Sequence, residues 1–232
     1  MHRSNLAPDV TQNSWVESLS PPVARGHALV DANIAARLSA AEKSGYRSSC
    51  GSGCSHCCYE PMYAEKQEAR FLVETLTADG ADMEVIRQRT QAWWDGFFSA
   101  GMHLRTTHTP GDFATLFRYR GARLACPVLA DGICTAYAAR PIGCRTHIAF
   151  GPRSACATER KRARQQFLLI PPELMSWALG EMCENAPCAL FEFDHLGIWL
   201  GHLLLGKSER SAIGHTAVVT QSAPLQPALA ET

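Results

Sequence analysis

The feature that most constrains this chain is a run of four cysteines within nine residues, Cys50-Gly-Ser-Gly-Cys54-Ser-His-Cys57-Cys58. The residues between the thiols are small or polar, so they offer little to a hydrophobic core. Gly51, Ser52 and Gly53 favour a tightly turning backbone over a helix or a strand. A loop that gathers thiols in this way binds either a metal or another sulfur, and the rest of the chain must supply the frame around it.

A second group of thiols follows further along the chain, at Cys126, Cys134, Cys144 and Cys156. Asp131-Gly132 is a turn signal that can fold the first two thiols back toward each other. Pro141 is expected to end a short helix over residues 135–140 and to leave Cys144 in an extended segment. The two cysteine regions together offer eight thiols, enough for a metal centre to which both regions contribute.

The spacing of the first group indicates how its thiols could be used. Cys54 and Cys57 are separated by two residues, the interval at which one turn presents two thiolates to one ion. The side chains of the adjacent residues Cys57 and Cys58 diverge. We therefore expect these two thiols to serve different ions, or different atoms of a cluster.

Cysteine number, length and charge narrow the class of protein. Ten cysteines are many for a chain of 232 residues in which no apolar stretch follows a basic start. We expect a cytosolic protein whose clustered cysteines bind metal or do redox work, with a disulfide framework as the alternative. The 22 basic and 22 acidic residues cancel, which argues against nucleic acid as a partner. The longest apolar run, 196–206, is too short to span a membrane.

Two longer motifs carry a family resemblance: Gly53-Cys54-Ser-His-Cys57-Cys58, and Cys126-Pro-x-Leu-x-Asp-Gly-x-Cys134-x2-Tyr137-x2-Arg140-Pro141-x2-Cys144-Arg145. Over residues 48–156 the chain resembles the YkgJ-type cysteine-cluster family, with a small departure at Thr135-Ala136-Tyr137. The resemblance implies a domain that chelates zinc or iron, and it implies no agreed reaction. The metal ligands that it implies here are Cys50, Cys54, Cys57, Cys58, Cys126, Cys134, Cys144 and Cys156.

Charged and imidazole side chains beside the cysteines have expected roles of their own. Four thiolates around one divalent ion leave an excess of negative charge, which needs cations or amide donors nearby if it is buried. We expect Arg140 and Arg145 to supply this charge from behind the ligands, although Arg140 could also be an ordinary helix-end cation. His56 and His147 could ligate, but histidines beside cysteines more often face solvent or pack behind the ligands.

Apolar residues recur at intervals of three and four along most of the chain, which predicts a mainly α, irregular helical domain around a Cys-rich metal centre, with little or no sheet. Residues 1–25 and 207–232 are expected to be disordered, and 26–206 to form one domain with its cysteine-cluster core at 48–156. Helices are expected around 30–41 and over 64–79, 81–98, 157–169, from 172 onward, and 193–205. The predicted core includes Trp93, Phe97, Trp177, Trp199 and Leu203.

Residues outside the two cysteine regions have simpler interpretations. Cys183 and Cys188 are typical of buried structural thiols. The basic run 160–164 is typical of a solvated helix face, with an anion-binding patch as the alternative.

Three functions are compatible with this sequence. The first is a cytosolic metal-binding protein that holds zinc, iron or an iron–sulfur cluster, since cysteine suits all three. The second is an enzyme. Cys50-x3-Cys54-x2-Cys57 has the radical SAM spacing, although His56 stands where an aromatic residue is usual, and the family resemblance extends to proteins linked to flagellin lysine methylation. The third is a protein-interaction module that metal only stiffens. No protein partner is indicated.

Overall fold

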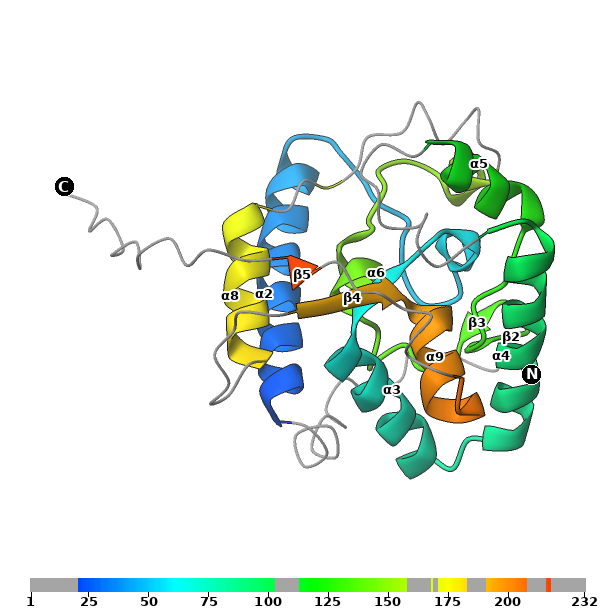
Figure 1. Cartoon of the computed structure of the whole chain (residues 1–232). Coiled ribbons are helices and arrows are strands. Elements are labelled where there is room, and N and C mark those ends of the chain that lie inside the picture. Colours follow the sequence, from blue (N-terminus) through cyan, green and yellow to red (C-terminus); the bar gives the residue numbers. More distant parts are fainter. Residues whose placement is uncertain are drawn as a thin grey trace, which may run out of the picture.

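The computed structural model describes residues 21–102, 113–157, 168, 171–182, 191–207 and 216–217. In these ranges the protein is mainly helical with two small sheets (Figure 1), which confirms the predicted fold class. Cys183, Cys188, the basic run 160–164 and most of the expected helix over 157–169 lie outside the described residues.

The longer helices are α2 (Pro21–Lys43), α3 (Lys66–Ala78), α4 (Met83–Ser99), α5 (Phe113–Ala122), α8 (Pro172–Met182) and α9 (Leu196–Leu205). The short helical turns are η1 (His56–Tyr59), α6 (Ile142–Thr146) and η2 (Arg153–Cys156). Strands β1 (Tyr63–Glu65), β4 (Phe191–His195) and β5 (Thr216–Ala217) form an antiparallel sheet in the order β1-β4-β5. Strands β2 (Leu129–Ala130) and β3 (Ile133–Cys134) form a separate hairpin.

Helices α3 and α4 lie close to their predicted positions because the sequence caps them. Glu65 accepts a hydrogen bond from the backbone N–H of Gln67, and Glu68 accepts one from the N–H of Glu65, which completes a capping box at the start of α3. Asp82 accepts from two N–H groups at the start of α4. The starts of both helices are therefore fixed by side chains within a few residues of them.

The structure differs from the sequence prediction at four places. Helix α2 begins at Pro21, inside the segment expected to be disordered, and proline is well tolerated in a first helical turn. Residues 135–140 form turns rather than a helix. Pro141 precedes α6 as its N-cap instead of ending a helix, so Cys144 is helical and not extended. Residues 193–195 belong to β4 because they pair with β1.

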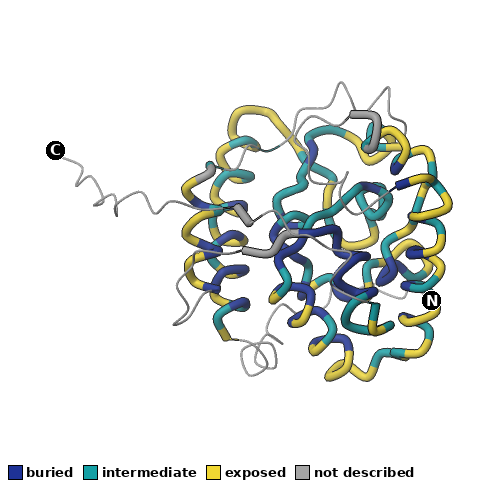
Figure 2. The backbone as a smooth tube through the Cα atoms, viewed as in Figure 1, coloured by how far each residue is buried: buried dark blue, intermediate teal, exposed yellow. Residues whose placement is uncertain are grey.

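Helix pairs enclose the core, with α2 against α8 and α4 against α9 (Figure 1). Figure 2 shows that buried residues gather in the centre of the molecule and along the inner faces of these helices. Trp93, Phe97 and Trp199 are buried as predicted, and Leu203 is partly buried. Trp177 is 56% exposed, so that prediction was wrong. The residues of α8 that are buried are Leu174, Ala178, Leu179 and Met182, a stripe that leaves Trp177 outside it.

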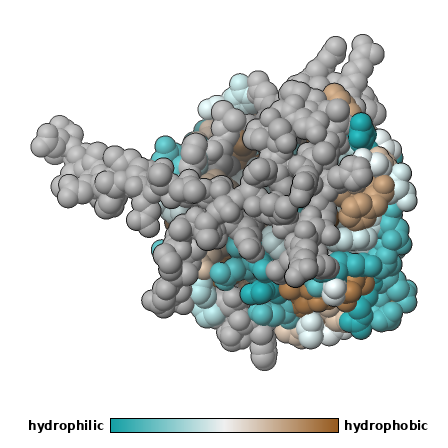
Figure 3. Space-filling view, viewed as in Figure 1, coloured by the Kyte–Doolittle hydropathy of each residue, from teal (hydrophilic) through white to brown (hydrophobic). Residues whose placement is uncertain are grey.

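On the face shown in Figure 3, hydrophilic and hydrophobic residues are interspersed over the described surface. No helix in the described ranges is both long enough and apolar enough to cross a membrane.

A buried polar network joins α2, α3 and α6. Glu68 of α3 accepts hydrogen bonds from Nε2 of His27 at 2.9 Å and from the backbone N–H of Ile142 at 2.7 Å. Burial lowers the pKa of His27, so its neutral ring donates to Glu68 and accepts from Arg145, whose guanidinium lies 3.2 Å from Nδ1. This network fixes the start of α6, the helix that carries Cys144.

The second constraint on α6 is steric. A Cβ atom added at Gly143 would lie 2.5 Å from the carbonyl oxygen of Tyr63 in β1, closer than non-bonded atoms tolerate. Because the obstacle is backbone rather than a flexible side chain, α6 can approach β1 only with glycine at this position.

Gly143→Ala is therefore expected to lower the free energy of unfolding by about 1–3 kcal/mol, as overpacking does elsewhere. Urea denaturation followed by circular dichroism measures the change. Gly121→Ala is the matched control, because Gly121 lies in α5 with no atom within 4 Å of its added Cβ. The control should be neutral or up to about 1 kcal/mol more stable. Equal effects of the two substitutions would contradict the steric argument.

Candidate metal centre

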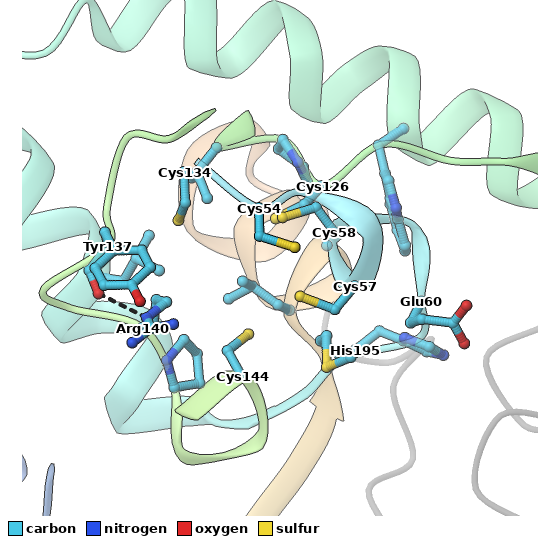
Figure 4. Close-up of a pocket in the computed structure, with 18 of the residues that line it drawn as sticks. Cys54, Cys57, Cys58, Glu60, Cys126, Cys134, Tyr137, Arg140, Cys144 and His195 are labelled. Atoms are coloured by element: carbon cyan, nitrogen blue, oxygen red, sulfur yellow. Dashed lines mark hydrogen bonds between the residues drawn. The ribbon is translucent and has the colours of Figure 1, made fainter. Parts of the chain in front are cut away.

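Three separate segments of the chain meet at one cavity, which has a volume of about 50 Å³. The first is the loop before and within η1, the second is the β2–β3 hairpin with residues 126–128 before it, and the third is α6. Six cysteines line the cavity: Cys54, Cys57, Cys58, Cys126, Cys134 and Cys144. Figure 4 shows them around a common space, with Cys134 and Arg140 on one side and Cys57 and His195 on the other.

A glycine turn and a backbone hydrogen bond bring the first two segments together. Gly53 turns the cysteine loop with φ of +79°, a conformation in which glycine carries no steric penalty. The carbonyl of Cys58 then accepts a hydrogen bond from the N–H of Cys126 at 2.8 Å. This bond joins the two cysteine regions directly at the cavity wall.

The β2–β3 hairpin turns the chain back at Asp131-Gly132, as the turn signal predicted. Asp131 and Gly132 both have positive φ, at 49° and 76°, the pattern of a tight two-residue hairpin turn. Leu129 pairs with Cys134 across the hairpin. The N–H of Leu129 also donates to the carbonyl of Cys126 at 2.9 Å. The chain thus returns Cys134 to the neighbourhood of Cys126.

Four of the cavity thiols have raised pKa values. Burial raises the pKa of Cys126 to about 12, and burial also raises the pKa values of Cys134 and Cys144. For Cys58 the main cause is a hydrogen bond with the Cys57 side chain, and burial adds to it, so that its pKa is also raised. Each of these thiols also feels the charge that its neighbours would carry. A coordinated cation would reverse this balance, because a metal-bound thiol loses its proton.

Arg140 supplies a positive charge at the cavity wall. Its guanidinium carbon lies 3.5 Å from the centre of the Tyr137 ring, and its Nε donates to the Tyr137 carbonyl at 2.9 Å. Its charge opposes the increase in the pKa values of Cys134 and Cys144. Arg140 is therefore placed where it could balance thiolate charge.

Arg145 lies outside the cavity lining. Its guanidinium donates to the carboxylate of Asp31 and to the carbonyls of Ala138 and Arg140, the last at 2.6 Å. Arg145 therefore holds the backbone that carries Arg140 and does not itself face the thiols.

The structure does not bring Cys50 or Cys156 into the cavity. Cys50 is exposed, and its sulfur exchanges hydrogen bonds with the backbone of Ala149, accepting from the N–H at 3.3 Å and donating to the carbonyl at 3.6 Å. Cys156 ends η2, which contacts η1. His56 and His147 are likewise absent from the cavity wall.

Sequence reasoning missed several residues that do line the cavity, among them His195 and Glu60. His195 is 2% exposed, and its ring stacks on those of Tyr63 and Tyr119 at 4.6 and 5.1 Å between centroids. Glu60 forms an ion pair with Arg120 at 2.7 Å. His195 reaches the site because β4 pairs with β1, opposite Tyr63. No local sequence signal indicates that pairing.

The remaining wall of the cavity is apolar. It is formed chiefly by Met62, Leu72, Trp93, Val128 and Leu196. The cavity lining therefore combines thiols with hydrocarbon and aromatic surface.

As the side chains stand, no three Cys, His, Asp or Glu residues in the described part of the chain form a group that could hold a metal ion. Coordination would require the thiols to turn inward, which rotation between staggered Cys rotamers permits. The donor set itself fits soft or borderline metals, since it consists of six thiols with one thioether, from Met62, beside them.

Comparison with known proteins adds nothing to this description: no family model, no curated protein and no solved structure matches the chain. The site has to be interpreted from its own residues.

Proposed function

We propose that this is a cytosolic protein that binds zinc, iron or an iron–sulfur cluster through the thiols of the central cavity. The observation that carries the proposal is the convergence of six cysteines from three separate segments on one cavity. The same residues carry the resemblance to the YkgJ-type cysteine-cluster family, which implies chelation. The proposed ligands are Cys54, Cys57, Cys58, Cys126, Cys134 and Cys144.

An ordinary packing role for these cysteines accounts poorly for their surroundings. Buried free cysteines usually behave as small hydrophobic side chains in a filled core. Here they surround open space, and Arg140 lies among them. A cation at a wall of neutral thiols has little to interact with, whereas a cation beside metal-bound thiolates offsets their excess negative charge.

The energetics of the loops support the same proposal. Residues 51–58 contain little apolar surface, and ordering a backbone costs about 1–2 kcal/mol per residue. Structural zinc sites contribute apparent binding free energies of about 10–16 kcal/mol in small peptides. Metal binding is therefore a sufficient source of free energy to hold the cysteine loop in place.

The test is the metal content of the full-length protein purified without oxygen. We expect bound zinc or iron by elemental analysis. A zinc protein would be colourless, whereas an iron–sulfur protein would be brown and would contain acid-labile sulfide. A protein that carries no metal, takes up none from added Zn²⁺ or Fe²⁺, and leaves all its thiols open to alkylation would refute the proposal.

A metal-dependent enzyme is the second candidate, and the apolar wall of the cavity favours it. A purely structural site needs no such wall, whereas substrate sites commonly combine hydrocarbon and aromatic surface with a few polar groups. The radical SAM form of this idea has less support. Its three-cysteine motif would need Cys50 beside Cys54 and Cys57, and Cys50 does not line the cavity.

A further inference from the structure

We infer that the six cavity thiols hold two metal ions that share bridging sulfurs. This inference rests on the proposed function and specifies how many ions the same site takes. A four-coordinate ion bound by cysteines alone takes four thiolates, so a single ion would leave at least two of the six thiols outside its coordination shell. Two four-coordinate ions use all six thiolates when two of the sulfurs are shared between them.

Backbone contacts around the cavity connect thiols of the two cysteine regions. Cys57 and Cys58 are adjacent in sequence, and both line the cavity. The Cys58–Cys126 backbone hydrogen bond and the β2–β3 hairpin then connect this pair to the next two thiols. Cys144 lies at the same cavity from α6.

Adjacent cysteines fit a pair of ions better than a single one. Successive side chains leave the backbone in different directions, so one ion is poorly placed to bind both Cys57 and Cys58. With two ions, each of these thiols can serve a different ion, or one can bridge the pair.

The electrostatics do not favour one ion over two. One divalent ion with four thiolates carries a net charge of about −2, and two divalent ions with six thiolates carry the same net charge. The cavity wall, with Arg140 as its cation, therefore has no more charge to balance in the second case. The volume is also sufficient, because a site for one water needs roughly 10–15 Å³ and this cavity has about 50 Å³.

The first test counts metal ions and protected thiols in the intact protein. The full chain, purified without oxygen, is loaded with Zn²⁺, desalted and analysed for zinc. It is then alkylated with iodoacetamide under native conditions and mapped by mass spectrometry. We expect two zinc ions per chain and protection of all six cavity cysteines, with labelling at Cys50 and Cys156.

The second test replaces the six cavity cysteines by Ser one at a time. If the thiols act as one set, every substitution should lower zinc content from two ions to one or fewer, because each thiol serves the shared centre. Cys50→Ser and Cys156→Ser are matched controls and should keep two ions. The alkylation map of the unsubstituted protein still decides the matter if a variant fails to fold.

Several outcomes would overturn the inference and leave the proposed function standing. One is a single zinc ion with two cavity cysteines that can be replaced without loss of metal. Another is iron with stoichiometric acid-labile sulfide in the protein as purified, because inorganic sulfide would then bridge the metals. Absence of any bound metal would overturn both the inference and the proposed function.

Discussion

Replacing Cys57 by Ser is expected to lower metal content and to loosen both cysteine regions at once, while α4 stays intact. The reason is that the two regions share one cavity and are joined there by the hydrogen bond from Cys126 to Cys58. Metal bonds that order one region must therefore order the other. Helix α4 contributes Trp93 to the cavity wall, but it has its own cap at Asp82 and packs on α9, contacts that do not involve the cysteine regions.

Hydrogen exchange measured by mass spectrometry, alongside metal analysis, tests this coupling. Amides in 50–58 and 126–134 should exchange at least tenfold faster in Cys57→Ser, and amides in 86–97 should not. Such a change corresponds to a local loss of about 1.4 kcal/mol or more in stability. Cys156→Ser is the control, since Cys156 lies outside the cavity. If only 50–58 responds, the two regions do not share a centre.

Replacing Glu68 by Ala is expected to be the most destabilising single change outside the cysteines. Glu68 is 1% exposed and accepts hydrogen bonds from His27, Glu65 and Ile142. Its removal would leave three buried donors without this acceptor. Breaking a buried charged network in this way costs about 3–5 kcal/mol.

Urea unfolding of Glu68→Ala should show this loss, and Glu74→Ala should change stability by less than about 0.5 kcal/mol. Glu74 is the matched control because it lies on the exposed side of the same helix. The metal content of Glu68→Ala should also fall, since Glu68 holds the N-terminus of the helix that carries Cys144. A stable variant with unchanged metal content would show that the network does not position α6.

The sequence by itself determined the fold class, the positions of α3 and α4, and the hairpin turn at Asp131-Gly132. These features depend on interactions between residues close together in the chain. A capping box, a side-chain cap and a two-residue turn each form within a few residues. The tight turn at 51–53 could be predicted for the same reason, because glycine and serine favour such a backbone wherever they occur.

Local signals were misleading where long-range pairing competed with them. Residues 193–195 have a helical pattern but form β4, because β1 offers backbone hydrogen bonds from a segment far away in the chain. Pro141 could either end or begin a helix. It begins α6 because Glu68, on another helix, accepts the N–H of Ile142.

Only the tertiary structure decided which cysteines belong to the candidate site. Eight thiols had equivalent local patterns, yet six line the cavity, while Cys50 is held against Ala149 and Cys156 lies at the end of η2. Likewise, Arg140 faces the thiols and Arg145 faces Asp31 and His27. His195 lines the cavity because β4 pairs with β1, and no local sequence pattern predicts that pairing. Side-chain direction depends on what each backbone segment packs against, and that packing involves residues distant in sequence.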